Sequence, residues 1–325
     1  MSMKRMSVVL GLLAACGDGG DDPAAPEQGA VARSEYAMET VELSEDLVIP
    51  AGQTVHVGPG VTFTAKSAEV KVDVLGTLIV EGSEAAPSIF EGTGESESWH
   101  GIVVEGGGNL TLQHAQVSGA KYGMFAMPGS AFNVDHVVFD TSFKAAVLES
   151  DGSVSHSTFR AVPLFPAVTE EVSVDDPNGC MTIINASPTV TDCRFEGSGG
   201  LNDMIRVGGQ SSPTFDHLYI EKSHCGFHMS GGINTSPRIS NTVFTDLAYG
   251  IMAFTMKPIV EGSVFIRNST DIGLCSGATA ANVPMLQNNF FEGGTLLLDA
   301  SCNRIGTKDA SPASAANASA GPSGL

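Results

Sequence analysis

Apolar residues recur along the chain in pairs whose members lie five positions apart. In chain order the pairs are Leu112/Val117, Val134/Phe139, Val154/Phe159, Val190/Phe195, Phe215/Ile220, Ile239/Phe244, Val260/Phe265 and Leu286/Phe291. Counted at the second member, successive pairs are separated by 20 to 26 residues, with one interval of 36. A fixed template that repeats at this period is typical of a solenoid in which each repeat forms one turn.

A second short apolar stretch follows most of these pairs. Examples are residues 123–127, 145–150, 180–185, 203–207 and 250–254. Turn-forming Gly, Pro, Asn or Ser residues separate the stretches, and no helical period lies between them, which excludes βαβ units. We therefore predict an all-β fold, a single-stranded right-handed parallel β-helix of about ten turns, with equivalent strands stacked about 4.8 Å apart.

One polar position lies two residues after the first member of each apolar pair. Its occupants in chain order are His114, His136, His156, Asp192, His217, Asn241, Gly262 and Asn288. A metal site would need imidazoles that converge on one ion at about 2.0–2.1 Å, whereas stacked turns hold their side chains parallel. The Asp and Asn members also suit hydrogen bonding. We interpret the column as a structural polar ladder that satisfies groups otherwise buried and unpaired, and we predict no bound metal.

The single interval of 36 residues indicates an insertion at residues 163–179, PLFPAVTEEVSVDDPNG. Its carboxylates, Glu170, Glu171, Asp175 and Asp176, are candidate ligand-binding residues. Insertions into solenoids often carry a binding surface, but a solvated surface loop explains the same residues. Both interpretations remain open.

The sequence contains four Tyr and one Trp, and most of its Phe fall at predicted core positions. Trp99, Tyr122 and Tyr249 are candidate platforms for a carbohydrate ring, and Tyr122 and Tyr249 each lie just before a Gly that opens a predicted strand. The alternative is that these rings pack at turns, where aromatic side chains contribute buried apolar area.

The N-terminus resembles an export signal. Lys4 and Arg5 precede an apolar run at residues 6–15 that is too short to cross a bilayer. Leu13-Ala14-Ala15-Cys16 resembles a bacterial lipobox, which implies cleavage before Cys16 and lipidation of its sulfur. We expect a signal peptide at 1–15, a flexible tether at 16–40, the β-helix at 41–310 and a disordered tail at 311–325.

The charge of the chain limits its partners. The sequence contains 16 Lys+Arg and 36 Asp+Glu, a formal net charge of -20. Such a chain repels nucleic acid and anionic membrane surfaces, so we expect no nucleic-acid partner. It also repels anionic polyuronates, which argues against a lyase that acts on them. The expected partners are a membrane, through the lipid on Cys16, and a polysaccharide or envelope protein.

Export implies an oxidising compartment, in which disulfides form. Beyond Cys16 the cysteines are Cys180, Cys193, Cys225, Cys275 and Cys302, an odd number. At least one is therefore unpaired within the chain, and the spacing does not choose between one disulfide and buried free thiols.

Several phrases resemble bacterial right-handed parallel β-helix proteins of the pectin-lyase-like superfamily. They are VIPAGQTVHVGPGVTFTA (48–65), VLGTLIVEGSEAAPSIFEG (74–92), SWHGIVVEGG (98–107) and LTLQHAQVSGA (110–120). The resemblance implies the fold but not an activity, since this fold carries many chemistries. The sequence lacks the catalytic signatures of polygalacturonases, mannuronan epimerases and pectate lyases, and we expect no cofactor.

These observations favour a non-catalytic lipoprotein of the bacterial envelope, at the outer membrane rather than the inner, that binds polysaccharide or protein on its β-helix. Two alternatives remain open. One is a polysaccharide lyase or hydrolase with an unrecognised site, and the other is a structural envelope component.

Overall fold

The fold was analysed in a computed structural model that describes residues 30–31, 34–93, 97–140, 142–160, 172–173, 179–200, 202–274, 283–292, 297–298, 304–306 and 321–322. The expected signal peptide and Cys16 lie outside these residues. Of the expected disordered tail, residues 321–322 are described, and there the Gly321 amide donates to the Asn241 carbonyl at 2.7 Å. Within the described residues, no helix is long and apolar enough to span a membrane.

Thirteen strands form one sheet, called sheet A, which is parallel except at its last pair. Its strands are β1 (Ala30–Val31), β4 (Leu47–Ile49), β7 (Lys71–Val74), β10 (Trp99–Val104), β12 (Ala120–Ala126), β14 (Lys144–Leu148), β17 (Met181–Ile184), β20 (Asp203–Gly209), β23 (Cys225–Gly231), β26 (Tyr249–Ala253), β29 (Thr270–Leu274), β32 (Leu297–Leu298) and β33 (Arg304–Gly306).

The remaining strands form two further parallel rows, joined by two long strands, β11 (Asn109–Ser118) and β13 (Ala131–Asp140), that belong to both. The first row contains β2 (Glu35–Tyr36), β5 (Thr54–Val57), β8 (Thr77–Glu81), β15 (Gly152–Ser155), β18 (Thr189–Thr191), β21 (Thr214–Asp216), β24 (Arg238–Ser240), β27 (Ile259–Glu261) and β30 (Met285–Gln287). The second row contains β3 (Thr40–Leu43), β6 (Thr62–Ala65), β9 (Ser88–Gly92), β16 (Thr158–Arg160), β19 (Arg194–Glu196), β22 (Tyr219–Glu221), β25 (Val243–Thr245), β28 (Val264–Ile266) and β31 (Phe290–Phe291).

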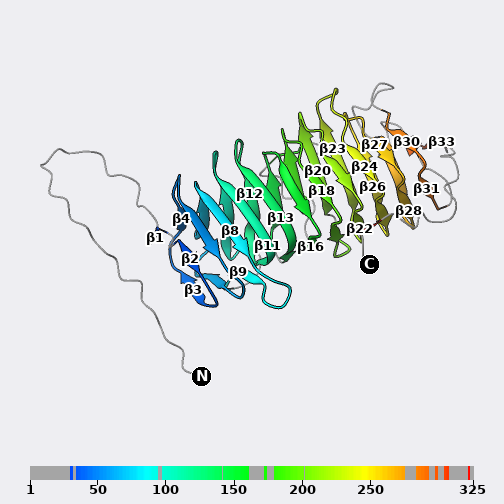
Figure 1. Cartoon of the computed structure of the whole chain (residues 1–325). Helices are drawn as coiled ribbons and strands as arrows, with labels where there is room; N and C mark the ends of the chain where they lie inside the picture. The colour runs from blue at the N-terminus through cyan, green and yellow to red at the C-terminus, as the bar shows by residue number, and fades with distance from the viewer. Residues whose placement is uncertain are drawn as a thin grey trace, which may run out of the picture.

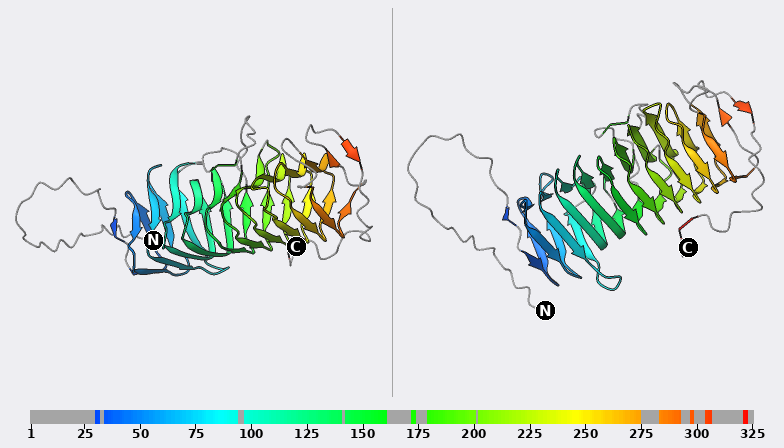
Figure 2. Two further views of the ribbon diagram at one scale, coloured as in Figure 1. Left: turned by 90° about the horizontal axis from the view of Figure 1, so that it is seen from above. Right: turned by 45° about the horizontal axis from the view of Figure 1, so that its top comes forward.

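Each turn of the chain thus contributes one strand to sheet A and one to each row, and successive turns stack along a single axis (Figures 1 and 2). The result is a parallel β-solenoid of about ten turns, which confirms the predicted fold class. Phe159 and Phe195, on either side of the predicted insertion, are direct neighbours in adjacent turns, so the extra residues belong to a single turn.

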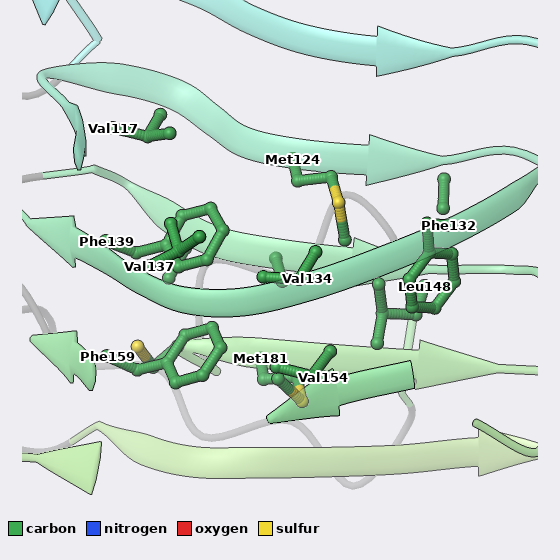
Figure 3. Close-up of a cluster of buried hydrophobic side chains, with 14 of the residues drawn as sticks. Val117, Met124, Phe132, Val134, Val137, Phe139, Leu148, Val154, Phe159 and Met181 are labelled. Atoms are coloured by element: carbon green, nitrogen blue, oxygen red, sulfur yellow. The ribbon is translucent and has the colours of Figure 1, made fainter. Parts of the chain in front are cut away.

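The predicted apolar pairs line the core. The second members of successive pairs lie in register from turn to turn. Where two neighbouring second members are both phenylalanine, their rings stack. Figure 3 shows Phe139 and Phe159 among these side chains, and their ring centroids lie 5.0 Å apart. Phe159 and Phe195 lie 4.7 Å apart, and the angle between the ring planes is 9° in both pairs. Full burial of one such side chain contributes about 1.5–3 kcal/mol, so the column is a main source of stability.

Candidate functional site

The predicted polar column lies at the corner between the two rows of strands. All eight members have a positive φ, between 45° and 60°. This left-handed conformation is open to glycine, and among other residues Asn, Asp and His adopt it most often. The mixture of His, Asp, Asn and Gly in the column therefore follows from the backbone conformation that the corner requires.

Asp135 links two turns of this column. One carboxylate oxygen lies 2.9 Å from His136 Nδ1, and the other lies 2.8 Å from His156 Nδ1 in the next turn. Ser155 Oγ donates to the second oxygen at 2.7 Å. Partial burial would raise the pKa of Asp135, but the hydrogen bonds from His156, His136 and Ser155 outweigh it and lower the pKa to about 2. We call Asp135, His136 and His156 the corner cluster.

Asp216 repeats this arrangement further along the solenoid. Its carboxylate lies 2.8 Å from His217 Nδ1, and it accepts from Asn241 Nδ2 at 2.8 Å and from Ser240 Oγ at 2.6 Å. Asn241 occupies the position that His156 holds beside Asp135. The same hydrogen-bond pattern therefore forms whether the following turn supplies an asparagine or a histidine.

The histidines of the column stack at the surface. Ring centroids are 4.6 Å apart between His114 and His136 and 4.7 Å apart between His136 and His156. The side chains of His136 and His156 are 46% and 43% exposed. These two side chains are in contact with water, so the hydrogen bonds that they make to Asp135 lie at the surface of the corner.

Buried polar groups are satisfied by the residue that follows four of the eight column members. Buried polar side chains occupy this next position at Ser157, Thr242, Ser263 and Asn289. The Ser157 hydroxyl, for example, donates to the Ser155 carbonyl at 2.7 Å and accepts from the Val137 amide at 3.1 Å. A second set of polar side chains, buried in four of the turns, thus lies one position after the polar column.

A second group of titratable side chains lies on the outer face of sheet A. Thr182 of β17, Arg206 of β20 and His228 of β23 are register neighbours, and the residues on either side of each belong to the main core. Alternation along a strand then directs these three side chains away from the core. All three have 0% exposure, so other parts of the chain cover this face.

Asp203 is the centre of this second group. Its carboxylate contacts Arg206 NH1 at 2.8 Å, His224 Nδ1 at 3.1 Å and His228 Nδ1 at 3.2 Å. Burial acts to raise the pKa of Asp203, but hydrogen bonds from the two histidines and the Arg206 charge hold it far below its ordinary value. We call Asp203, Arg206, His224 and His228 the buried cluster. Beside it, Lys144 Nζ donates to Thr182 Oγ1 at 2.9 Å.

The insertion reaches this face at its described residues. A Cβ atom placed on Gly208 would lie 2.7 Å from Val172 Cβ, and one placed on Gly179 would lie 2.9 Å from Arg206 Cδ. Val172 and Gly179 therefore pack directly on β20 and its side chains. The candidate ligand-binding residues Glu170, Glu171, Asp175 and Asp176 lie outside the described residues.

The candidate aromatic platforms differ in exposure. Trp99 is 1% exposed, and its indole N–H donates to the Ser118 carbonyl at 2.8 Å, so it packs inside rather than offering a free face. Tyr249 is partly buried, with its ring 5.5 Å from that of His224. Tyr122 is 6% exposed and belongs to a group of rings on β10 and β12.

That group, which we call the aromatic face, consists of His100, Tyr122 and Phe125. The Tyr122 ring lies 5.5 Å from both the His100 and Phe125 rings, and Lys121 Nζ lies 5.2 Å from its centroid. His100 and Phe125 remain partly exposed. Burial, with Lys121 and Lys71 nearby, lowers the pKa of His100, which keeps its ring neutral near pH 7.

Three cysteines within the described residues are buried and form no disulfide there, namely Cys180, Cys193 and Cys225. Burial raises the pKa of Cys180 and of Cys193 to about 12, so both remain protonated and unreactive near neutral pH. This agrees with buried free thiols at these positions. Cys275 and Cys302 lie outside the described residues.

Comparison with known proteins adds no family: no protein-family model matches the chain, and no curated protein matches it. Function must therefore be argued from the corner cluster, the buried cluster and the aromatic face.

Proposed function

We propose that the protein is a non-catalytic, lipid-anchored protein of the bacterial envelope that binds a polysaccharide on the outer face of its β-helix, at the aromatic face. The lipobox-like sequence ending at Cys16 supports the anchor, and we propose the outer membrane rather than the inner as its location. The phrases shared with pectin-lyase-like β-helices support a place in that superfamily. An envelope protein is the other partner class that this surface suits.

The observation that carries this proposal is the contact between His100, Tyr122 and Phe125 on a rigid stack of parallel strands. Aromatic rings offer an apolar surface at low cost in conformational entropy, and the C–H faces of a sugar ring pack against such a surface. Lys71 lies beside it and contacts Asp73 at 3.0 Å and Glu105 at 3.9 Å, which supplies polar groups for hydroxyls.

A non-catalytic role is supported by how the chain uses its acid–base groups. The corner cluster stabilises a turn through hydrogen bonds, and the buried cluster has Asp203, Arg206 and His228 at 0% exposure. A group that acts on a polysaccharide must come within hydrogen-bond reach of it, about 2.6–3.2 Å. A lyase or hydrolase that used the buried cluster would therefore need the cover over Asp203 and His228 to move.

Binding to a glycan array and to isolated cell-wall polysaccharides tests the proposal. The purified protein should bind at least one polysaccharide, and Phe125→Ala should weaken that binding about tenfold or more, the effect of losing about 1.4 kcal/mol of contact energy. Ile233→Ala is the matched control, because Ile233 is 73% exposed and lies on a different part of the surface.

Release of reducing ends or unsaturated products should be absent when the bound polysaccharide is incubated with the protein. Turnover that is abolished by Asp203→Asn would establish the enzymatic alternative. Polysaccharide binding that Phe125→Ala leaves unchanged would show that the aromatic face is not the site.

A further inference from the structure

The corner cluster has a composition that its hydrogen-bonding role does not require. Asp135, His136 and His156 each offer a ligand atom, and these atoms all lie within 4.8 Å of one another. Among the described residues, no other group of three His, Cys, Asp or Glu side chains meets that condition. We propose that these three residues bind one divalent first-row transition-metal ion, with Zn²⁺ as its simplest representative.

The distances within the cluster suit such an ion. The two nitrogen–oxygen distances are 2.9 Å and 2.8 Å. Ligand atoms that each lie about 2.1 Å from a zinc ion are about 3.0–3.4 Å from one another, for angles between square and tetrahedral. The two nitrogen–oxygen distances therefore fall only a few tenths of an ångström short of this range, and the third separation, between the two histidines, is within 4.8 Å. The half-exposed histidine side chains have room to adjust both.

The proton balance is simple. A carboxylate only accepts hydrogen bonds, so in the metal-free protein each histidine carries its proton on Nδ1. Binding of the ion at Nδ1 moves that proton to Nε2 through solvent, and a neutral ring releases no net proton. The ion replaces both hydrogen bonds with coordinate bonds, and the strongly negative net charge of the chain favours its approach.

No metal was predicted from the sequence, because stacked histidines do not converge on one ion. The structure supplies a third ligand from outside the column, since Asp135 precedes His136 and reaches both turns. Two imidazoles and a carboxylate form a ligand set suited to zinc and its neighbours, and three protein ligands leave a position for water or another ligand.

The Asp216 group provides an internal control. It has the same hydrogen-bond pattern, but Asn241 takes the place of His156, and an amide is a much weaker ligand for zinc than imidazole. His156→Asn therefore converts the corner cluster into a copy of the Asp216 group. Asparagine also tolerates the left-handed backbone at this position, so the change should preserve the fold.

Calorimetric titration of the metal-free, full-length protein with ZnCl₂ tests the proposal. We expect one saturable zinc site in the wild type, at least tenfold weaker zinc binding for His156→Asn, and unchanged binding for His217→Asn. Asp135→Asn is the second variant, with folding of each variant checked by circular dichroism, and it should also lose the site.

Absence of saturable binding in the wild type would overturn the proposal. Equal zinc affinity in folded His156→Asn or Asp135→Asn would do the same, because it would place the ion elsewhere. If His156→Asn does not fold, the result for Asp135→Asn decides between these outcomes.

Discussion

The corner cluster and the buried cluster contain the same chemical groups in opposite surroundings. In each, one aspartate contacts the Nδ1 atoms of two histidines. In the corner cluster both histidines are at the surface, whereas in the buried cluster Asp203 and His228 are fully buried and the His224 side chain is 18% exposed. The buried cluster adds Arg206, whose permanent charge stabilises the Asp203 carboxylate away from water. The difference shows that burial and a neighbouring cation, rather than residue type, decide which cluster is a fixed structural element and which can exchange ligands.

The largest loss of unfolding free energy is expected for Asp203→Ala. The substitution removes the buried carboxylate that Arg206, His224 and His228 contact. Removing one member of a buried ion pair costs about 3–5 kcal/mol of unfolding free energy. Urea unfolding measured by circular dichroism gives this quantity. A loss below about 1 kcal/mol would mean that the cluster is hydrated in solution, which removes the contrast with the corner cluster.

Asp271 is a buried carboxylate whose hydrogen-bond partner, Asn268, is neutral. It therefore tests whether a buried carboxylate needs a neighbouring cation to remain ionised. Burial raises the pKa of Asp271 to about 6, Glu292 adds to this, and the hydrogen bond from Asn268 opposes it. The folded state therefore holds a proton that the unfolded state releases near pH 4, and stability falls as the pH rises from about 4 to 6.

Asp271→Asn should therefore stabilise the protein by about 1–3 kcal/mol at pH 8 and leave its stability nearly unchanged at pH 4. Urea unfolding at the two pH values measures both. An Asp271→Asn variant that is less stable at pH 8 would imply a cation partner for Asp271.

A smaller loss of unfolding free energy is expected when a residue that disfavours the left-handed backbone is placed at the corner. His136 has φ of 53°, a conformation that costs most L-residues about 1–2 kcal/mol. His136→Val should lower the unfolding free energy by about that amount, while His136→Asn should change it by less than about 0.5 kcal/mol. Equal losses for the two variants would point to the imidazole contacts rather than the backbone.

The smallest change in stability is expected for Asp135→Asn. Partly exposed pairs contribute about 0–1 kcal/mol, so the loss in unfolding free energy at pH 7 should stay below about 1 kcal/mol. Because hydrogen bonds lower the pKa of Asp135 to about 2, this contribution is present above about pH 4 and is lost as the pH falls towards 2. Parallel urea series for wild type and variant at pH 7 and pH 2.5 check the amount and its sign.

Much of the architecture could be predicted from the sequence because it depends on local repetition. Each turn places an apolar residue at the same two positions, so Phe139, Phe159 and Phe195 could be aligned from the five-residue pair template, even across the interval of 36 residues. The residue types in the polar column also indicated the backbone conformation of that position. His, Asp, Asn and Gly are the residues that accept a left-handed backbone, a signal that we interpreted as side-chain hydrogen bonding alone.

The buried cluster could not be predicted in the same way. Asp203 and Arg206 lie in one turn and His228 in the next, and their contact depends on strand register that no local pattern fixes. Their burial depends in addition on what covers sheet A. The burial of Trp99 follows from similar long-range packing, since its partner Ser118 lies nearly one turn away.

Histidine side-chain nitrogen resonances, recorded by long-range proton–nitrogen NMR during a zinc titration, compare the two clusters in one experiment. We expect the Nδ1 signals of His136 and His156 to shift and saturate together at one equivalent of zinc, while those of His224 and His228 stay unchanged. Shifts at His224 and His228, or no shift at His136 and His156, would contradict the account of one ligand-accessible cluster and one sealed structural cluster.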